Sequence, residues 1–236
     1  MALPVLNAVK YKTVIPSLGK EVEYRPYLVK EEKILMIALE SNDQKQILTA
    51  IKDVIKSCLY DDSININALA MFDIESLFLK LRSKSVGETT EVKAKCEKCE
   101  HEHLQEINFD DIKLPEVVQK INTIELTDEV GLTLKYPSVG DIEKHESDKM
   151  DSIEGLMEVI VDSIESIYDA DNVYSAKDET RKSLKDFVDS LNSDQFSKLT
   201  KFFESVPALS YNLNFECSNC GHKNEVELRG LQNFFG

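Results

Sequence analysis

Hydrophobic and polar residues alternate along the start of the chain, and this pattern predicts a β-hairpin. The two alternating runs lie within residues 9–24, and the tetrapeptide Pro16-Ser17-Leu18-Gly19 between them is typical of a turn. After Pro26, a charged run over residues 30–33 precedes a cluster of apolar residues. We expect a helix here with a polar start and a buried end. The buried end comprises Ile34, Leu35, Met36, Ile37 and Leu39.

Apolar residues then recur three and four positions apart, which predicts two further helices. Asp43 can cap the first of these, whose apolar face comprises Ile47, Leu48, Ile51, Val54, Ile55 and Leu59. Cys58 lies near that face, so we interpret it as a core residue rather than a reactive thiol. The other helix is expected to start at Asp73 and to place on one face Ile74, Leu77, Phe78 and Leu81.

Short alternating segments follow these helices and predict two strands around a Cys-x-x-Cys turn. The strands are expected over residues 91–95 and 102–109, on either side of Cys96 and Cys99. The second half of the chain repeats this plan. We expect helices over residues 151–168, 183–191 and 193–204, and strands over residues 211–216 and 223–228.

The similarity between the halves amounts to an internal repeat. The run Cys96-Glu97-Lys98-Cys99-Glu100-His101 matches Cys217-Ser218-Asn219-Cys220-Gly221-His222 at an offset of 121 residues. Upstream the offset is shorter, for example 111 residues between Pro26 and Pro137, so the second copy must contain an insertion. We place this insertion in the acidic stretch 169–181 and expect a surface loop there. Chance similarity of helical segments does not account for the matched cysteines.

These patterns predict an α+β protein with an internal duplication. The first repeat comprises residues 1–118 and the second comprises residues 119–236, and each is mostly helical and ends in a β-hairpin zinc knuckle. A pseudo-twofold axis between the repeats would bring the two knuckles together into one zinc ribbon. We therefore expect the repeats to form one compact unit.

The net charge of −15 disfavours nucleic acid as a partner, because phosphate groups repel an acidic surface. Residues 1–118 carry 16 basic and 20 acidic side chains, so most of the acidic excess lies in the second half. No apolar run approaches the ~20 residues that cross a bilayer. The N-terminal residues also lack the features of a secretory signal. We expect a cytoplasmic protein that does not bind a membrane.

Thiols stay reduced in the cytoplasm, so closely spaced cysteines indicate a metal site rather than disulfides. We predict that one structural zinc ion is bound in tetrahedral geometry by Cys96, Cys99, Cys217 and Cys220. Two alternatives stay open. Each half could bind its own metal with help from His101 or His222, with His103 as a spare ligand, or the cysteines could be free thiols.

The predicted site does not suit catalysis, because four thiolates leave no open position on the metal for water or substrate. The sequence also lacks a glycine-rich phosphate loop, a nucleophile elbow and an HExxH pattern. We therefore expect a protein that is not an enzyme, with no catalytic residues and no small-molecule substrate.

Two segments carry the motifs that are most characteristic of a known protein family. One is Tyr24-Arg25-Pro26-Tyr27-Leu28-Val29-Lys30-Glu31-Glu32-Lys33, and the other continues from Phe72-Asp73-Ile74-Glu75 to Ser85-Val86-Gly87-Glu88. Both resemble the baseplate hub and hub-assembly proteins of T-even-type contractile-tailed bacteriophages. The resemblance implies a structural or assembly role in the baseplate hub, with other hub or tail proteins as partners. It implies a location in the host bacterial cytoplasm during assembly or in the tail of the virion.

A zinc-ribbon regulatory protein that binds nucleic acid is the alternative function. Lys93, Lys95 and Lys98 cluster near the first knuckle, but acidic residues between them cancel their charge. The aromatic segment 231–236 is a candidate docking element for a partner protein, unless it packs on the protein's own core.

Overall fold

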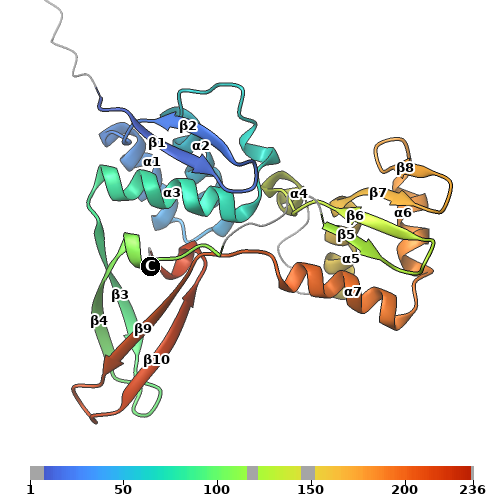
Figure 1. The fold of residues 1–236 in the computed structure, drawn as a ribbon. Helices are drawn as coiled ribbons and strands as arrows, with labels where there is room; N and C mark the ends of the chain where they lie inside the picture. The colour runs from blue at the N-terminus through green and yellow to red at the C-terminus, as the bar shows by residue number, and fades with distance from the viewer. Residues whose placement is uncertain (1–7, 116–121, 145–151, 235–236) are drawn as a thin grey trace, which may run out of the picture. The chain divides into compact units, whose positions relative to one another are not determined.

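The computed structural model describes residues 8–115, 122–144 and 152–234 (Figure 1). By its internal contacts the chain divides into two compact units. Unit 1 comprises residues 1–66, 72–116 and 207–236, and unit 2 comprises residues 67–71 and 117–206. The mixed helices and small antiparallel sheets confirm the α+β class.

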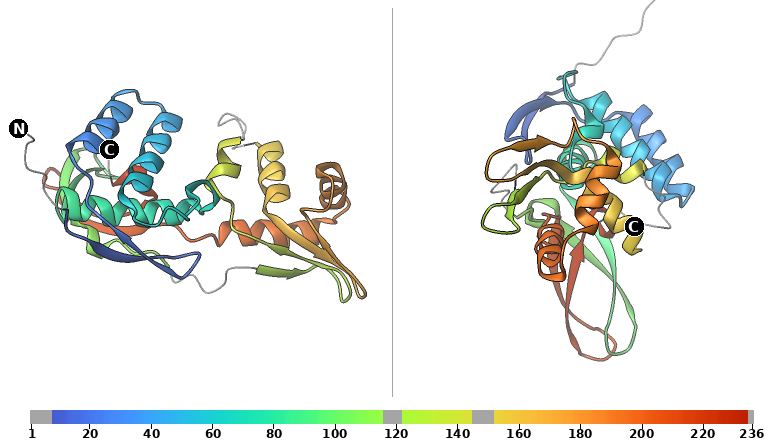
Figure 2. Two further views of the ribbon diagram at one scale, coloured as in Figure 1. Left: turned by 90° about the horizontal axis from the view of Figure 1, so that it is seen from above. Right: turned by 90° about the vertical axis from the view of Figure 1, so that its right-hand side faces the viewer.

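Unit 1 begins with the expected hairpin, in which β1 (Tyr11–Ile15) pairs antiparallel with β2 (Lys20–Tyr24). Helices α1 (Val29–Glu40) and α2 (Gln44–Cys58) follow and pack side by side (Figure 2). The side chain of Asp43 caps α2, because it accepts hydrogen bonds from the backbone N–H groups of Lys45 and Gln46. Cys58 is buried in the core, and burial raises the pKa of its thiol to about 11.

Helix α3 (Met71–Ser85) starts two residues before the predicted position, so Asp73 lies within its first turn. This carboxylate is fully buried and accepts hydrogen bonds from the backbone N–H of Ser17 at 2.8 Å and from its hydroxyl at 2.5 Å. Asp73 therefore connects α3 to the turn of the first hairpin. Between α2 and α3 lies the short helix η1 (Ile66–Ala68).

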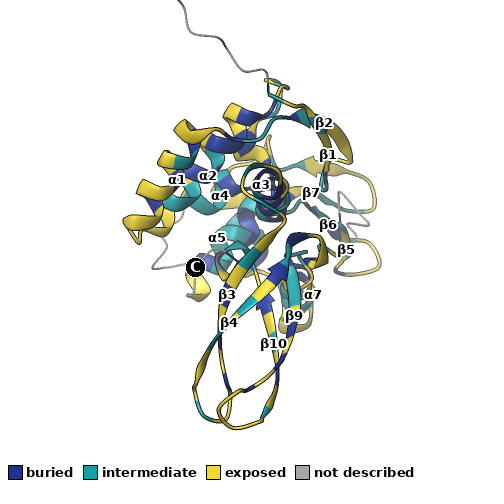
Figure 3. Ribbon diagram, turned by 90° about the vertical axis from the view of Figure 1, so that its left-hand side faces the viewer, coloured by how far each residue is buried: buried dark blue, intermediate teal, exposed yellow. Residues whose placement is uncertain are grey.

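The prediction that α1 has a buried apolar end is wrong for most of the residues concerned (Figure 3). Only Leu35 of the five is buried, together with Ala38. The other four apolar side chains are about half exposed or more: Ile34, Met36, Ile37 and Leu39. The reason is geometric, because consecutive residues of a helix point in different directions and α2 covers one stripe of α1.

Two long hairpins complete unit 1. In the first, β3 (Thr89–Lys95) pairs with β4 (Glu102–Asn108), and in the second β9 (Ser210–Glu216) pairs with β10 (Lys223–Arg229). Each strand of the second hairpin begins and ends 121 residues after its counterpart in the first. The short helices η2 (Phe109–Asp111) and η4 (Leu231–Asn233) follow them. Inward-facing side chains of both hairpins share one core, which includes Val92, Ile107, Leu213 and Leu228.

The C-terminal segment also packs in this core, because Phe234 is fully buried among the residues of the two hairpins. The backbone N–H groups of Leu209 and Leu231 donate hydrogen bonds to the buried carboxylate of Glu75 on α3. Of the two roles considered for this segment, the described residues support packing on the protein's own core.

Unit 2 contains an antiparallel sheet with the strand order β5 (Asn122–Glu125), β6 (Gly131–Leu134), β7 (Ile164–Tyr168) and β8 (Val173–Ser175). Its helices are α4 (Val139–Lys144), α5 (Ile153–Ser163), α6 (Arg181–Asp189) and α7 (Ser193–Glu204). Apolar side chains from the sheet and from α5, α6 and α7 form one core, whose fully buried members include Leu132, Leu134, Ile160 and Leu199.

Two predictions for unit 2 need correction. The helix predicted over residues 151–168 ends at Ser163, and residues 164–168 instead form β7 between β6 and β8. The stretch 169–181 is not a plain loop, because it contains β8 and the first residue of α6. Residues 164–168 include the strand-favouring Ile164, Ile167 and Tyr168, and pairing with β6 and β8 stabilises the strand over a longer helix.

The order of elements is similar in the two halves of the chain. Among the described residues, each half has a hairpin, three α-helices and a second hairpin, and the second half adds β7, β8 and α6 before α7. The compact units do not coincide with these halves, because residues 207–236 belong to unit 1.

Candidate metal centre

Each of the long hairpins of unit 1 turns through a Cys-x-x-Cys knuckle of the same backbone geometry. In the first, the N–H of Cys96 donates to the carbonyl of His101 at 2.9 Å, and in the second the N–H of Cys217 donates to the carbonyl of His222 at 2.8 Å. Both knuckles need one residue with a positive φ angle. This residue is Glu100 at +57° and Gly221 at +67°, 121 positions apart.

The four cysteine sulfurs of these knuckles lie together. The Sγ atoms of Cys96 and Cys220 are 3.7 Å apart, those of Cys99 and Cys217 are 3.6 Å apart, and all four lie within 4.8 Å of one another. Zinc–sulfur bonds of ~2.3 Å in a tetrahedron require sulfur–sulfur distances of about 3.8 Å. The sulfur positions therefore fit a tetrahedral thiolate site, in which each close pair joins the two hairpins.

Backbone groups of the first knuckle favour the thiolate form. Burial opposes ionisation of Cys96, but the N–H groups of Cys99 and Lys98 and the neighbouring thiols outweigh it and lower the pKa of Cys96 to about 6. The pKa of Cys99 is also lowered, first by the N–H of His101 and then by the side chain of Asn219. Thiolate is the form that binds a metal ion.

The fourth thiol, that of Cys220, is less easily ionised because it lies beside three other sulfurs. The N–H of His222 lowers the pKa of Cys220, but partial desolvation of this exposed residue's thiol and the three other cysteines outweigh that effect and raise the pKa to about 12. Negative charge already held by neighbouring sulfurs opposes a further thiolate. A divalent cation among the four sulfurs would remove this repulsion.

The histidines near the knuckles do not join the group of four close ligand atoms. His101 is exposed, and His222 is partly buried. His103 points across to the second hairpin, where its Nε2 lies 3.3 Å from Cys217 Sγ. The closest set of candidate ligands among the described residues is therefore the four cysteines.

Two asparagines also contribute to the site, and the sequence interpretation missed both. Asn224 is 3 % exposed, and its Oδ1 accepts a hydrogen bond from the N–H of Glu97 in the opposite knuckle at 2.9 Å. Its Nδ2 donates to the carbonyl of His222 at 3.1 Å. The Nδ2 of Asn219 lies 3.6 Å from Cys99 Sγ. The repeat could have pointed to Asn224, because the offset of 121 makes it the residue of the second repeat that is equivalent to His103.

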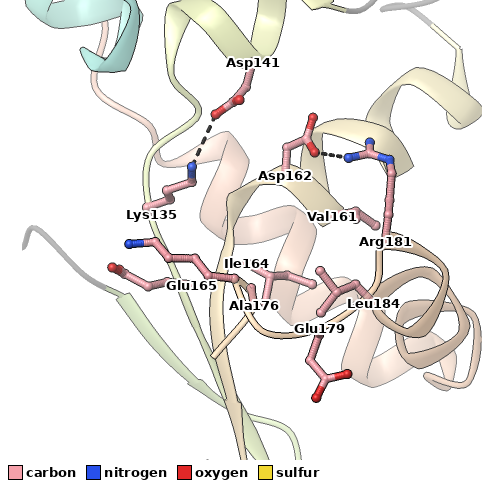
Figure 4. Close-up of a pocket in the computed structure, with 11 residues that line it drawn as sticks. Lys135, Asp141, Val161, Asp162, Ile164, Glu165, Ala176, Glu179, Arg181 and Leu184 are labelled. Carbon is pink, nitrogen blue, oxygen red and sulfur yellow. Dashed lines mark hydrogen bonds and ion pairs between the residues drawn. The ribbon is translucent and has the colours of Figure 1, made fainter. Parts of the chain in front are cut away.

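A separate hollow of about 320 Å³ lies in unit 2 and is lined by charged residues of α5, α6 and the neighbouring strands (Figure 4). Arg181 forms ion pairs with Asp162 and Glu158, and Lys135 lies 3.3 Å from Asp141. Hydrogen bonds from Arg181 and Lys185 lower the pKa of Glu158 to about 2. The residues that line this hollow include no histidine, cysteine or serine, and its charged side chains include the ion-paired Arg181, Asp162, Lys135 and Asp141.

Comparison with known proteins gives the family. The model of the family described as T4 bacteriophage base plate protein matches residues 8–236. The chain belongs to this family. It is therefore a structural protein of a phage baseplate, a part of the virion tail, and it interacts with other phage structural proteins. No significant match was found among curated proteins or among solved structures.

The family membership confirms the resemblance seen in the sequence. Arg25 and Glu31 of the first resembling segment form an ion pair at 2.9 Å, and Glu31 also accepts a hydrogen bond from the N–H of Leu28. Within the described residues, no helix of this baseplate protein is long and apolar enough to span a membrane.

Proposed function

We propose that this baseplate protein is a zinc-stabilised scaffold or assembly factor of the baseplate hub. The observation that carries the proposal is the spacing of the four cysteine sulfurs, which fits a tetrahedral zinc ion. The proposed ligands are Cys96, Cys99, Cys217 and Cys220. Zinc is the preferred metal for four thiolates in a site without an open position, and the role is structural rather than catalytic.

A shared ion would tie together two hairpins that are far apart in the sequence. Cys99 and Cys217 are separated by 118 positions, and their sulfurs lie on the same cluster. Because binding requires both hairpins to be in place, the free energy of metal binding adds to the free energy of folding of unit 1. A rigid arrangement of this kind suits a protein that presents contact surfaces to neighbouring hub components.

We also propose that the chain arose by duplication, with residues 1–118 and 119–236 as the two copies. The support is the equal length of β3 and β9 and of β4 and β10 at one offset, together with the similar element order. In this view the hairpin β9–β10 belongs to the second copy by sequence but packs in the same compact unit as the first copy. The elements β7, β8 and α6 are then the insertion in the second copy. The protein would act in the host bacterial cytoplasm during assembly and remain in, or leave, the finished tail.

Metal analysis of protein purified without added metal tests the proposal. We expect one zinc ion per chain, and the double variant Cys96→Ser/Cys217→Ser should contain none. Cys58→Ser is the matched control, because Cys58 is buried away from the cluster in α2 and its loss should leave the zinc content unchanged. Two ions per chain would replace the shared site with separate sites, and a metal-free wild-type protein would refute the zinc scaffold.

A second experiment tests the role in the baseplate. Cells that supply the Cys96→Ser/Cys217→Ser variant in place of the wild-type protein during phage infection should yield fewer complete tails than cells that supply Cys58→Ser. Electron microscopy of the lysates measures the fraction of tails with a baseplate. Equal fractions would show that the cysteine cluster is not needed for assembly.

A further inference from the structure

His103 reaches from the first hairpin into the half of the cysteine cluster that belongs to the second hairpin. It lies in β4 opposite Ala94, and its Nε2 is 3.3 Å from the sulfur of Cys217. The imidazole ring also packs against Phe215 of β9, with ring centroids 5.0 Å apart, and against His101 with centroids 4.9 Å apart. Two of its three contacts therefore belong to the other hairpin, and the ring is held in one orientation.

The position of His103 is matched in the second hairpin by Asn224, 121 residues later. Asn224 lies opposite Phe215 in β10 and reaches the first knuckle, where it accepts the N–H of Glu97. Each hairpin thus sends one polar side chain, from the same position, to the knuckle of the other. The two contacts differ in chemistry, because Asn224 binds backbone whereas His103 meets a sulfur that is a candidate metal ligand.

We propose that His103 is a positioning residue of the metal centre, which donates its Nε2–H to the Cys217 thiolate and slows the release of the metal. A thiolate can only accept a hydrogen bond, so Nε2 must carry the proton in this contact. Four thiolates around one divalent cation leave two excess negative charges, and a donated N–H reduces the charge on one sulfur. This inference rests on the proposed zinc site and adds a residue that is not a ligand.

The same contact also holds the hairpins around the ion. Cys217 is buried, so its sulfur leaves the cluster only when the hairpins separate or its side chain turns away. His103 opposes both movements, because it binds the sulfur directly and packs on Phe215 next to it. Groups that orient metal ligands in this way typically change metal affinity by about 10- to 100-fold.

A matched pair of variants separates the hydrogen bond from the packing. His103→Phe keeps an aromatic ring against Phe215 but removes the N–H, whereas His103→Gln removes the ring but places an amide N–H near the Nε2 position. We expect zinc transfer to a coloured chelator to become about tenfold faster in His103→Phe. His103→Gln should stay close to the wild type.

Cobalt substitution gives a readout that packing alone does not change. Loss of the hydrogen bond makes the thiolate more electron-rich, so the sulfur-to-cobalt charge-transfer band should move to lower energy in His103→Phe and not in His103→Gln. Leu104→Ala on the same strand is the control, because the side chain of Leu104 is 63 % exposed and its replacement should leave the band unmoved.

The possible results distinguish this inference from the proposed zinc site. A wild-type protein that binds no metal would refute both. A wild-type protein that binds zinc, with unchanged release and an unchanged cobalt band in His103→Phe, would refute the role of His103 alone. Nitrogen-15 NMR of the zinc-loaded wild-type protein tests it without any variant, since we expect the proton on Nε2, and a proton on Nδ1 only would overturn the inference.

Discussion

Glu75 on α3 accepts a hydrogen bond from the backbone N–H of Leu231, which lies 156 positions further along the chain, at 3.1 Å. The other carboxylate oxygen accepts the N–H of Leu209 at 3.4 Å. One buried side chain thus holds both the entry to the second long hairpin and the segment that follows it.

Replacement of Glu75 by alanine should destabilise unit 1. Two backbone N–H groups would lose their acceptor, and each unsatisfied buried donor costs about 1 to 3 kcal/mol, so we expect a loss of about 2 to 6 kcal/mol in the free energy of unfolding. Urea denaturation measures the total. Hydrogen exchange at the Leu209 and Leu231 amides should be faster as well. The exposed Glu91 on β3 offers a control, and equal losses in Glu75→Ala and Glu91→Ala would contradict the role of Glu75.

The two buried carboxylates Glu75 and Glu31 should give unit 1 opposite responses to pH. Burial is the main cause that raises the pKa of Glu75, so its contribution to stability is fully present below the unfolded value near 4.5 and is lost as pH rises through the folded pKa. Burial also opposes ionisation of Glu31, but hydrogen bonds from Arg25 and Leu28 outweigh it and lower the pKa. The contribution of Glu31 is therefore present above about 4.5 and is lost as pH falls.

Variants that cannot ionise test this pair of signs. As pH rises above about 4.5, we expect the wild type to lose stability relative to Glu75→Gln. As pH rises through the acid range to about 4.5, we expect the wild type to gain stability relative to Glu31→Gln. Urea titrations at several pH values measure both. Parallel slopes for the two variants would show that one assignment has the wrong sign.

Substitutions on α1 should separate its exposed apolar residues from its buried ones. Ile37 is 69 % exposed, so Ile37→Lys should change the free energy of unfolding by no more than about 0.5 kcal/mol. Leu35 is 9 % exposed, and Leu35→Lys would bury a charge and should cost more than about 3 kcal/mol. Thermal unfolding followed by circular dichroism compares the two. A large loss in Ile37→Lys would mean that this face is packed in the folded chain.

The positive φ angle of Glu100 predicts a stabilising substitution in the first knuckle. A residue with a side chain pays about 1 to 2 kcal/mol in the left-handed region, whereas glycine pays about 0.5 to 1 kcal/mol in lost chain freedom. Glu100→Gly should therefore stabilise the protein by about 0.5 to 1 kcal/mol, and Gly221→Glu in the second knuckle should destabilise it by a similar amount. Thermal unfolding of both variants measures this. A lower melting temperature in Glu100→Gly would contradict the expectation.

Local patterns in the sequence were sufficient to predict much of the fold. The period of apolar residues located α2 and α7, since one face of each helix is buried and the other is polar. Alternation located the four long strands. The helix cap Asp43 and the turn at residues 16–19 were also recognisable, because both are formed by residues close to one another in the sequence.

The features that the sequence did not reveal depend on contacts between distant residues. The run of apolar residues in α1 does not show which of them face α2, and only Leu35 and Ala38 do so closely enough to be buried. Residues 164–168 suit a helix or a strand by themselves, and the pairing with β6 and β8 decides between them. The closeness of the four cysteines could be predicted from their spacing and the repeat, but the contact of His103 with Cys217 spans 114 positions and appears only in the folded chain.

The discontinuity of unit 1 has a consequence for how the protein is made. The ribosome synthesises β3 and β4 long before β9 and β10, because residues 117–206 of unit 2 come between them. During this interval the inner faces of β3 and β4, with Val92, Ala94 and Ile107, lack the hairpin that covers them later. The nascent chain therefore carries an uncovered apolar surface that risks aggregation until the second long hairpin has left the ribosome and folded onto the first.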